Sequence, residues 1–303
     1  MLYAVENGKM VQRDIGEAAD SRGHYFGVYA VEEAAAVLDA FALSEKPLRD
    51  AAANTSMVYE SHEGFDFVSV SDLNRTSLHA RPIRIFIYLR KNLILMFSDH
   101  TTLIEKVCKD MDCAVHISFE RLLFAFFERL TADDASLLEK MEQEIIGLED
   151  ALITSRKRNC VKEIISLRKR LMVLKRYYEQ LLGLLDELQE NENGLLPGIA
   201  LRYFKIFAGR VDRFYHSVIN LRDYVTQVRE AYQAEVDIGL NNIMKIFTVI
   251  TAVFLPLTLL VGWYGMNLQM PEFRWSFGYP MVILIAIAIV VVCMVIFKKK
   301  KWF

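Results

Sequence analysis

The chain has 303 residues, of which 53% are hydrophobic and 24% charged, and its formal net charge is −2. Because acids interleave with bases, the basic stretches "SRKRN" and "RKRLMVLKR" are interpreted as solvated helix faces, and no nucleic-acid partner is expected. Nucleotide-binding and hydrolase motifs are absent, and the six histidines and four cysteines have no metal-ligand spacing. We therefore expect no enzyme, no catalytic residue and no resident cofactor.

Residues 1–117 alternate short strand-like and helix-like segments and predict a cytosolic α/β domain. The segments "HYFGVYA" and "FDFVSV" are typical of strands, and "VEEAAAVLDAFAL" is typical of a helix with one apolar face. The segment "RIFIYLRKNLILMFS" predicts a hairpin whose turn is Arg90-Lys91-Asn92. These patterns leave the order of the strands open.

Residues 118–196 predict cytosolic antiparallel helices. One helix is expected to begin at Thr131 with an acidic first turn, and a long amphipathic helix is expected to begin at Cys160 and to end before the breaker cluster "ENENGLLPG". Residues 197–245 predict a stalk helix that continues into an apolar segment. A helix of about 65 residues would be about 100 Å long, which indicates bundling with copies of itself.

Two uncharged apolar segments near the C-terminus predict transmembrane helices 1 (246–264) and 2 (279–297), joined by an outer loop (265–278). Each is close to the length of about 20 residues that spans a bilayer. The tail (298–303) begins with a basic cytoplasmic collar formed by Lys298, Lys299, Lys300 and Lys301. The positive-inside rule then predicts cytoplasmic termini at a plasma (inner) membrane, with membrane lipid as a partner.

One face of the first span combines polar and small residues. A heptad spacing connects Asn241, Met244, Thr248, Thr251, Leu255, Thr258, Gly262 and Gly265. Two interpretations remain open: helices packing closely through small residues, or the lining of a narrow water-filled pore with apolar constrictions. Pro256 inside the span requires a neighbouring helix or water to satisfy the carbonyl that it leaves without a donor.

The heptad face contains no acid, histidine or cysteine. Soft metals prefer thiolate or imidazole ligands, so this face is not suited to strip water from zinc or copper. Neutral amide and hydroxyl oxygens suit a hard cation, and Mg²⁺ gives up its water reluctantly. The residues therefore indicate a hydrated hard cation.

The pattern N-x-x-M-K-x-x-T…P-L-T…G-x-Y-G-M-N, followed by "MPE" and "FKKKKW", resembles the CorA family of magnesium transport proteins over residues 241–303. The upstream region is similar to the family in order and length. The resemblance implies an α+β cytosolic domain, a long stalk helix and two transmembrane helices in a pentameric, funnel-shaped helical membrane channel. It implies passive uptake of hydrated Mg²⁺ through a homopentameric pore, with Co²⁺ or Ni²⁺ as secondary substrates.

The resemblance also implies the site. Gly265, Met266 and Asn267 would form the ion-selective outer mouth, and Asn241 would form a polar ring at the inner end. Gly265, Asn267 and Asn241 would hold the ion through its hydration shell. The expected pore-lining residues are Asn241, Met244, Phe247, Thr251, Leu255, Thr258 and Gly262. The family places Phe247 in the pore where strict heptad counting places Thr248, and a phenylalanine there is expected to tighten the gate.

Two further residues bear on regulation and ion capture. Ile206 aligns with a family acid that helps to bind regulatory Mg²⁺, so we expect feedback by cytosolic Mg²⁺ to be weakened or placed elsewhere. Glu272 is the only acid of the outer loop. Five copies would make a ring that concentrates cations, although an ordinary surface carboxylate is the alternative interpretation.

Two other functions remain as alternatives. The zinc-transporting branch of the same superfamily often changes the middle residue of the tripeptide, which is intact here as Met266. A two-span anchor for a coiled-coil scaffold, without transport, is disfavoured by the polar face of the first span.

Overall fold

A computed structural model describes residues 1–6, 9–16, 23–54, 56–101, 104, 119–153, 160–267, 270, 275–300 and 302. The chain forms two compact units, Met1–Val228 and Arg229–Phe303. Helix α8 (Gly198–Tyr264) contributes to both units.

A seven-stranded sheet lies in the first unit, with the order β2-β1-β3-β7-β6-β5-β4. The strands are β1 (Leu2–Glu6), β2 (Lys9–Arg13), β3 (Tyr25–Tyr29), β4 (Val58–His62), β5 (Phe65–Asp72), β6 (Ile83–Arg90) and β7 (Leu93–Ser98). Neighbouring strands pair antiparallel, except that β3 and β7 pair parallel. The sheet is therefore mixed.

The predicted hairpin is confirmed as β6 and β7, but its turn is shorter than expected. Arg90 is the last residue of β6 and pairs with Leu93, so only Lys91 and Asn92 form the turn. A two-residue loop is the commonest connection between antiparallel strands. β5 and β7 are buried along their length, and Phe67, Ile85 and Leu95 in the middle of the sheet are at 0% exposure.

Two short helices pack on one face of the sheet: α2 (Ala34–Ala40) and α3 (Lys46–Ala53). The predicted helix around residue 31 begins as a 3₁₀ turn, η1 (Val31–Glu33), before α2. Their apolar side chains join the aromatic residues of the sheet in one core, which includes Val37, Leu38, Leu48, Phe67, Phe86, Tyr88 and Phe97.

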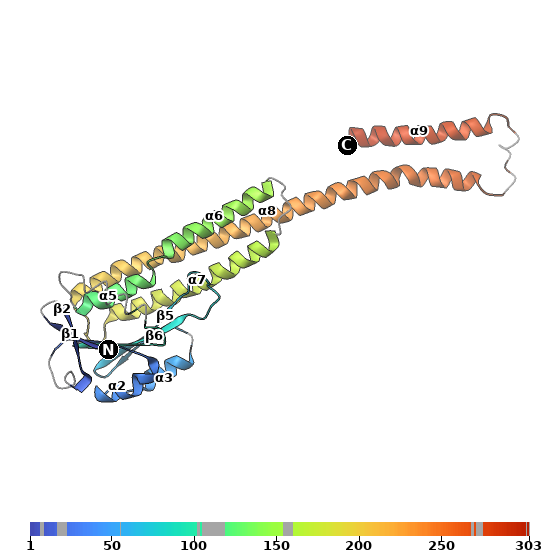
Figure 1. The fold of residues 1–303 in the computed structure, drawn as a ribbon. Helices are drawn as coiled ribbons and strands as arrows, with labels where there is room; N and C mark the ends of the chain where they lie inside the picture. The colour runs from blue at the N-terminus through green and yellow to red at the C-terminus, as the bar shows by residue number, and fades with distance from the viewer. Residues whose placement is uncertain are drawn as a thin grey trace. The chain divides into compact units, whose positions relative to one another are not determined.

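The helical part of the first unit consists of α5 (Phe119–Leu130), α6 (Asp134–Ile153), α7 (Cys160–Glu190) and the first part of α8. Figure 1 shows α6, α7 and this part of α8 side by side. Arg170 of α7 pairs with Glu144 of α6 at 2.5 Å, and the ring of Tyr178 of α7 lies 5.8 Å from that of Phe214 of α8. The predicted long helix from Cys160 and the uninterrupted helix into the first span are confirmed.

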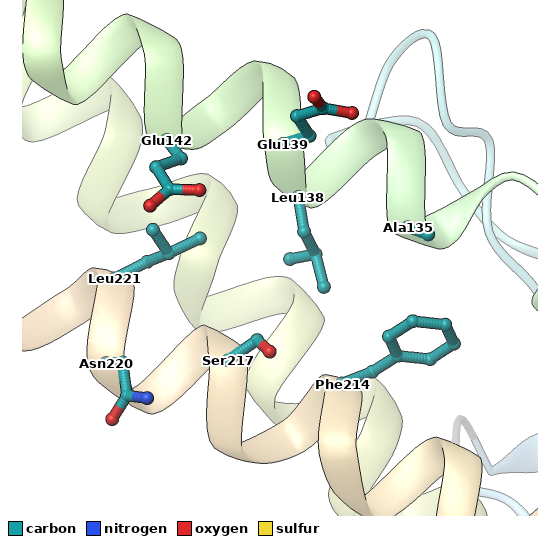
Figure 2. A pocket seen from close by; sticks show the side chains of 8 residues that line it. All are labelled: Ala135, Leu138, Glu139, Glu142, Phe214, Ser217, Asn220 and Leu221. Carbon is teal, nitrogen blue, oxygen red and sulfur yellow. The ribbon is translucent and has the colours of Figure 1, made fainter.

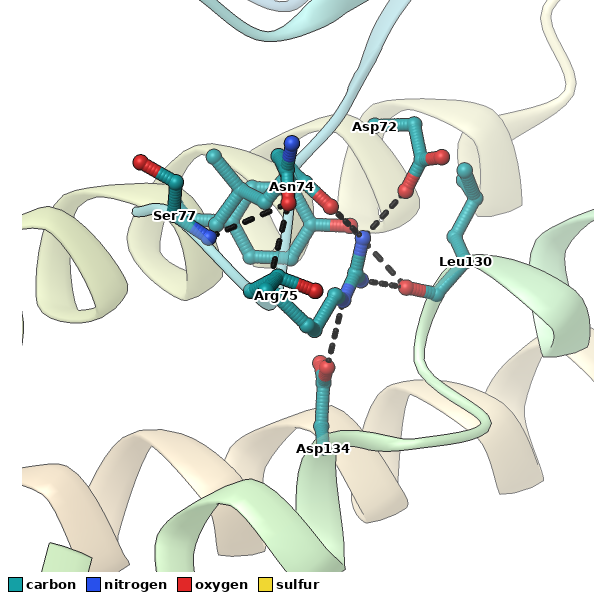
Figure 3. Close-up of polar contacts among 9 residues, drawn as sticks. Asp72, Asn74, Arg75, Ser77, Leu130 and Asp134 are labelled. Carbon is teal, nitrogen blue, oxygen red and sulfur yellow. Dashed lines mark hydrogen bonds and ion pairs between the residues drawn. The ribbon is translucent and has the colours of Figure 1, made fainter. Parts of the chain in front are cut away.

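The prediction that a helix begins at Thr131 is wrong, because α6 begins at Asp134. Residues 131–133 form a turn in which the Asp134 amide donates to the Thr131 carbonyl at 3.2 Å. Arg75 explains the interruption, because its guanidinium donates to the Leu130 carbonyl and to the Asp134 carboxylate, the latter at 2.9 Å (Figure 3). One side chain thereby donates hydrogen bonds to acceptors on both sides of the turn.

The same arginine forms a buried ion cluster that connects the loop after β5 to three helices. Arg75 also pairs with Asp72 and lies 5.7 Å from the centre of the Tyr177 ring of α7. The Asp134 side chain is 1% exposed. Burial raises the pKa of the Asp72 carboxyl above its usual value, and the nearby Arg75 opposes that rise. These ion pairs join the sheet to the helices of the first unit.

Candidate ion pathway

The second unit contains two helices that are long and apolar enough to cross a membrane, by length and composition. They are the apolar part of α8 and α9 (Gly278–Lys299), with mean hydropathies of 2.2 and 3.2 over their most apolar windows. α8 ends at Tyr264, as predicted for the first span. Lys298 and Lys299 lie in the last turn of α9, where cations favour the negative end of the helix dipole.

One face of α8 is partly covered and lies toward α9. The half-buried residues recur at spacings of three and four: Val249, Ala252, Val253, Pro256, Leu257, Leu260 and Tyr264. Within this set, the carbonyl of Ala252 accepts a hydrogen bond from the thiol of Cys293 of α9, with Sγ and O 3.7 Å apart. This contact identifies the half-buried face as the one against α9.

The opposite face of α8 contains the predicted lining. Met244, Phe247, Thr251, Leu255, Thr258 and Gly262 are all exposed in the single chain, and helical geometry puts them on the side away from α9. Asn241 is exposed as well, but it precedes Ala252 by about three turns and therefore points close to the direction of Ala252. The exposed fractions of Met244, Phe247 and Leu255 are 62%, 62% and 69%. Thr248 is exposed as well, so burial in one chain does not separate Phe247 from Thr248 as the lining residue.

The threonine hydroxyls on this face bond to their own helix. Thr248 donates to the Met244 carbonyl at 2.8 Å, and Thr251 donates to the Phe247 carbonyl at 2.9 Å. Thr258 does the same with the Phe254 carbonyl at 2.8 Å. A hydroxyl has a single hydrogen, so each oxygen offers only acceptor lone pairs beyond the helix. Water around a cation directs its hydrogens outward, and these oxygens can accept them.

The tripeptide after α8 forms a tight helix end. The Gly265 amide donates to the Val261 carbonyl at 2.8 Å, and the Met266 amide donates to the Trp263 carbonyl at 3.4 Å. A Cβ added at Gly265 would lie 2.9 Å from the Val261 carbonyl oxygen, so a side chain at this position would force the helix end to shift. Asn267 follows, exposed, beside the negative end of the α8 dipole. An amide oxygen there suits a hydrated cation.

The other predicted residues do not lie on the lining face of α8. Glu272 and Lys301 lie outside the described residues. Ile206 lies in the first unit on α8, with 57% of its side chain exposed. The nearest acid that follows it on α8, Asp212, lies 3.6 Å from His216. Cys293 was missed by sequence reasoning as a contact of α8, although Pro256 signalled that some donor was needed.

A cavity of about 350 Å³ lies between α6 and α8 in the first unit (Figure 2). Its lining residues are Ala135, Leu138, Glu139, Glu142, Phe214, Ser217, Asn220 and Leu221. Among the described residues, no group of three or more His, Cys, Asp or Glu side chains is placed to hold a metal ion.

The fold and the face of α8 define a membrane protein with two apolar helices and neutral oxygen groups along one of them. A comparison with protein families matches residues 29–301 to CorA, described as CorA-like Mg²⁺ transporter protein. The chain therefore belongs to the CorA-like Mg²⁺ transporter family. This family consists of transporters and is not a known class of enzyme.

Individual relatives agree with this assignment. The cobalt/magnesium transport protein CorA of Thermotoga maritima is 30% identical over 237 residues, which cover 76% of this chain and 67% of the relative. The complete CorA magnesium transporter of Methanocaldococcus jannaschii has a TM-score of 0.82 at 18% identity, covering 100% of this chain and 98% of that chain. The ZntB cytoplasmic domain from Vibrio parahaemolyticus has a TM-score of 0.65 at 11% identity, covering 78% and 97%. At these identities, the two structures show the fold alone.

Proposed function

We propose that this protein is a passive channel that takes up hydrated Mg²⁺ down its electrochemical gradient. The observation that supports this most directly is the face of α8 away from α9, where threonine oxygens offer acceptors and Asn267 follows the helix end. Mg²⁺ gives up its inner water shell reluctantly, so a lining of neutral acceptors suits it. Co²⁺ and Ni²⁺ are proposed as secondary substrates.

The pore is proposed to be formed by five copies of α8 in a homopentamer. Within the described part of the second unit, only Gly278 is buried, and the apolar window of α8 is 0% buried in the single chain. So many large apolar side chains, among them Phe247 and Leu255, form a continuous exposed apolar surface that is not stable in water. Lipid is proposed to cover one part of the surface and neighbouring copies the other. The number five rests on the family resemblance.

The proposed location is the plasma (inner) membrane, with both termini in the cytoplasm. Lys298, Lys299 and Lys300 follow the second span and would lie on the cytoplasmic side. An inside-negative potential would then favour entry by roughly 2.3 kcal/mol per charge for each 100 mV. The proposal needs no nucleotide.

Regulation is proposed to differ from the family pattern at Ile206. Its exposed hydrocarbon side chain offers no oxygen to Mg²⁺. Isothermal titration of the full-length protein with Mg²⁺ should detect weak binding or none in the first unit. Tight binding that is lost when Asp212 or another acid of this unit is replaced would show instead that a different cytosolic site has taken over.

Liposome flux tests the function. Purified full-length protein in liposomes with an inside-negative potential should carry Mg²⁺, measured with an internal indicator, and should carry Zn²⁺ much more slowly. Faster Zn²⁺ entry would favour the zinc branch of the superfamily. Flux no greater than in empty liposomes, with the protein correctly assembled, would favour the scaffold anchor and contradict the proposal.

A further inference from the structure

Pro256 interrupts the hydrogen bonding of α8 within its apolar part. A proline has no backbone N–H, and its ring crowds the carbonyl four residues earlier. In α8 that carbonyl belongs to Ala252. An unsatisfied carbonyl is costly in a membrane, because no bulk water is present to pair with it.

Cys293 of α9 supplies a donor to this carbonyl. Its Sγ lies 3.7 Å from the Ala252 carbonyl oxygen, and the side chain is half-buried. Between Met281 and Phe297 the sequence of α9 contains no other side chain that can donate a hydrogen bond. The one thiol of this span therefore lies opposite the carbonyl that Pro256 leaves without a helix donor.

The contact lies behind the proposed pore lining. Thr251 and Leu255 are the residues directly before Ala252 and Pro256, and both lie on the face away from α9. A proline allows a helix to bend at the carbonyl that it frees. Whatever bonds to that carbonyl therefore influences the direction of the rest of α8, which bears Thr258 and Gly262.

We propose that Cys293 is a positioning residue: its hydrogen bond to the Ala252 carbonyl fixes the bend of α8 at Pro256 and thereby the width of the pore at Thr251 and Leu255. This inference rests on the proposed channel function. Cys293 does not touch the ion. It should therefore affect the maximum rate of flux more than the Mg²⁺ concentration for half-maximal flux, which the mouth at Asn267 governs.

Flux through variants in liposomes tests the role. Cys293→Ala should lower the maximum Mg²⁺ rate by about two- to fivefold, as expected for a weak S–H···O bond repeated in each copy, with little change in the half-saturating concentration. Cys293→Ser retains a donor and should restore most of the rate. Val292→Ala is the matched control, because it shortens an exposed neighbour on α9 that has no polar side-chain atom.

A double substitution separates this hydrogen bond from general packing. Pro256→Ala provides an N–H that can bond to the Ala252 carbonyl within the helix. In the Pro256→Ala background, Cys293→Ala should therefore cause no further change in rate. An equal loss from Cys293→Ala in both backgrounds would overturn the proposal.

Infrared spectroscopy of the S–H stretch gives a readout that does not depend on transport. The Cys293 band, obtained by subtracting the spectrum of Cys293→Ala, should lie at the lower frequency of a bonded thiol and should rise in Pro256→Ala. A wild-type band at the frequency of a free thiol would overturn the contact. Wild-type protein that carries no Mg²⁺ would overturn the proposed function and leave the infrared result to decide the contact.

Discussion

The two units of this chain differ in how far a single copy buries its apolar side chains. In Met1–Val228, the sheet and helices bury most of their large apolar side chains, and the buried Asp134 pairs with the half-buried Arg75. In Arg229–Phe303, apolar side chains such as Phe254 and Leu259 remain 61% and 71% exposed. The first unit has its own buried core, whereas in our proposal lipid and other copies cover the apolar surface of the second. Damage to the first should therefore appear as lost stability, and damage to the second as altered transport.

The largest expected effect is in the first unit, at the buried ion cluster. Arg75→Ala should lower the free energy of unfolding of this unit by about 3–5 kcal/mol, because it leaves the Asp134 carboxylate buried without its partner. Chemical denaturation of the full-length protein in detergent, followed by tyrosine fluorescence, measures this. Arg49→Ala is the matched control, since Arg49 pairs with Glu45 at 2.7 Å on the surface and its side chain is 73% exposed. Equal losses in the two variants would contradict the assigned role of burial.

In the second unit, Asn267→Ala should lower Mg²⁺ flux by about tenfold or more. Losing roughly 1 kcal/mol of hydrogen bonding in each copy weakens capture of the hydrated ion cumulatively. Stability of the first unit should not change, which sharpens the contrast with Arg75→Ala. Liposome flux and denaturation on the same preparation measure both quantities. Flux equal to the wild type would remove Asn267 from the proposed mouth.

Gly265→Ala should have a smaller effect, lowering flux by about threefold. The added Cβ would lie 2.9 Å from the Val261 carbonyl oxygen, so the helix end must shift and displace Asn267. Bond-angle changes of about 7° that would relieve such a contact cost about 1 kcal/mol. Gly239→Ala is a suitable control on the same helix, because a Cβ there meets no atom within 4 Å in the single chain. Similar losses from both variants would argue against a special role of the helix end.

The smallest effect concerns the pH dependence of stability in the first unit. Burial raises the folded-state pKa of Asp72 above its unfolded value, so the folded state holds its proton more tightly. The stability contributed by Asp72 therefore increases as pH falls through the folded pKa toward the usual aspartate value. The unfolding free energy of the wild type minus that of Asp72→Asn, measured against pH, should become more positive as pH falls. A value that becomes more negative on acidification would show that pairing with Arg75 outweighs burial.

The sequence predicts local and periodic features of this fold well. The hairpin of β6 and β7, the long helix α7 and the length of α8 all follow from turn residues and helical periodicity. The order of the strands does not, because the parallel pairing of β3 with β7 joins segments far apart in the chain. The interruption before Asp134 also escaped prediction, since nothing in the sequence distinguishes Arg75 from the other 35 basic residues as the partner of Asp134.

The sequence likewise predicts some features of the candidate site and leaves others open. Heptad spacing predicts that residues such as Thr251 and Thr258 share a face, and the structure puts that face away from α9. Spacing also shows that Pro256 leaves a carbonyl without a donor. It does not show which residue donates a hydrogen bond to this carbonyl, because that depends on how α9 is rotated against α8. The hydrogen bond from Cys293 therefore needed the structure.

The threonine hydroxyls of α8 have one more consequence. Each donates its only hydroxyl hydrogen to a carbonyl of its own helix. The proposed lining therefore presents oxygen lone pairs and no free hydroxyl donor at Thr251 and Thr258. A chloride ion would find no hydrogen there to bind, although no negative side chain repels it. Rejection of anions at these positions would thus come from the direction of O–H bonds. Because no titratable group takes part, we expect it to persist unchanged from acidic to alkaline pH.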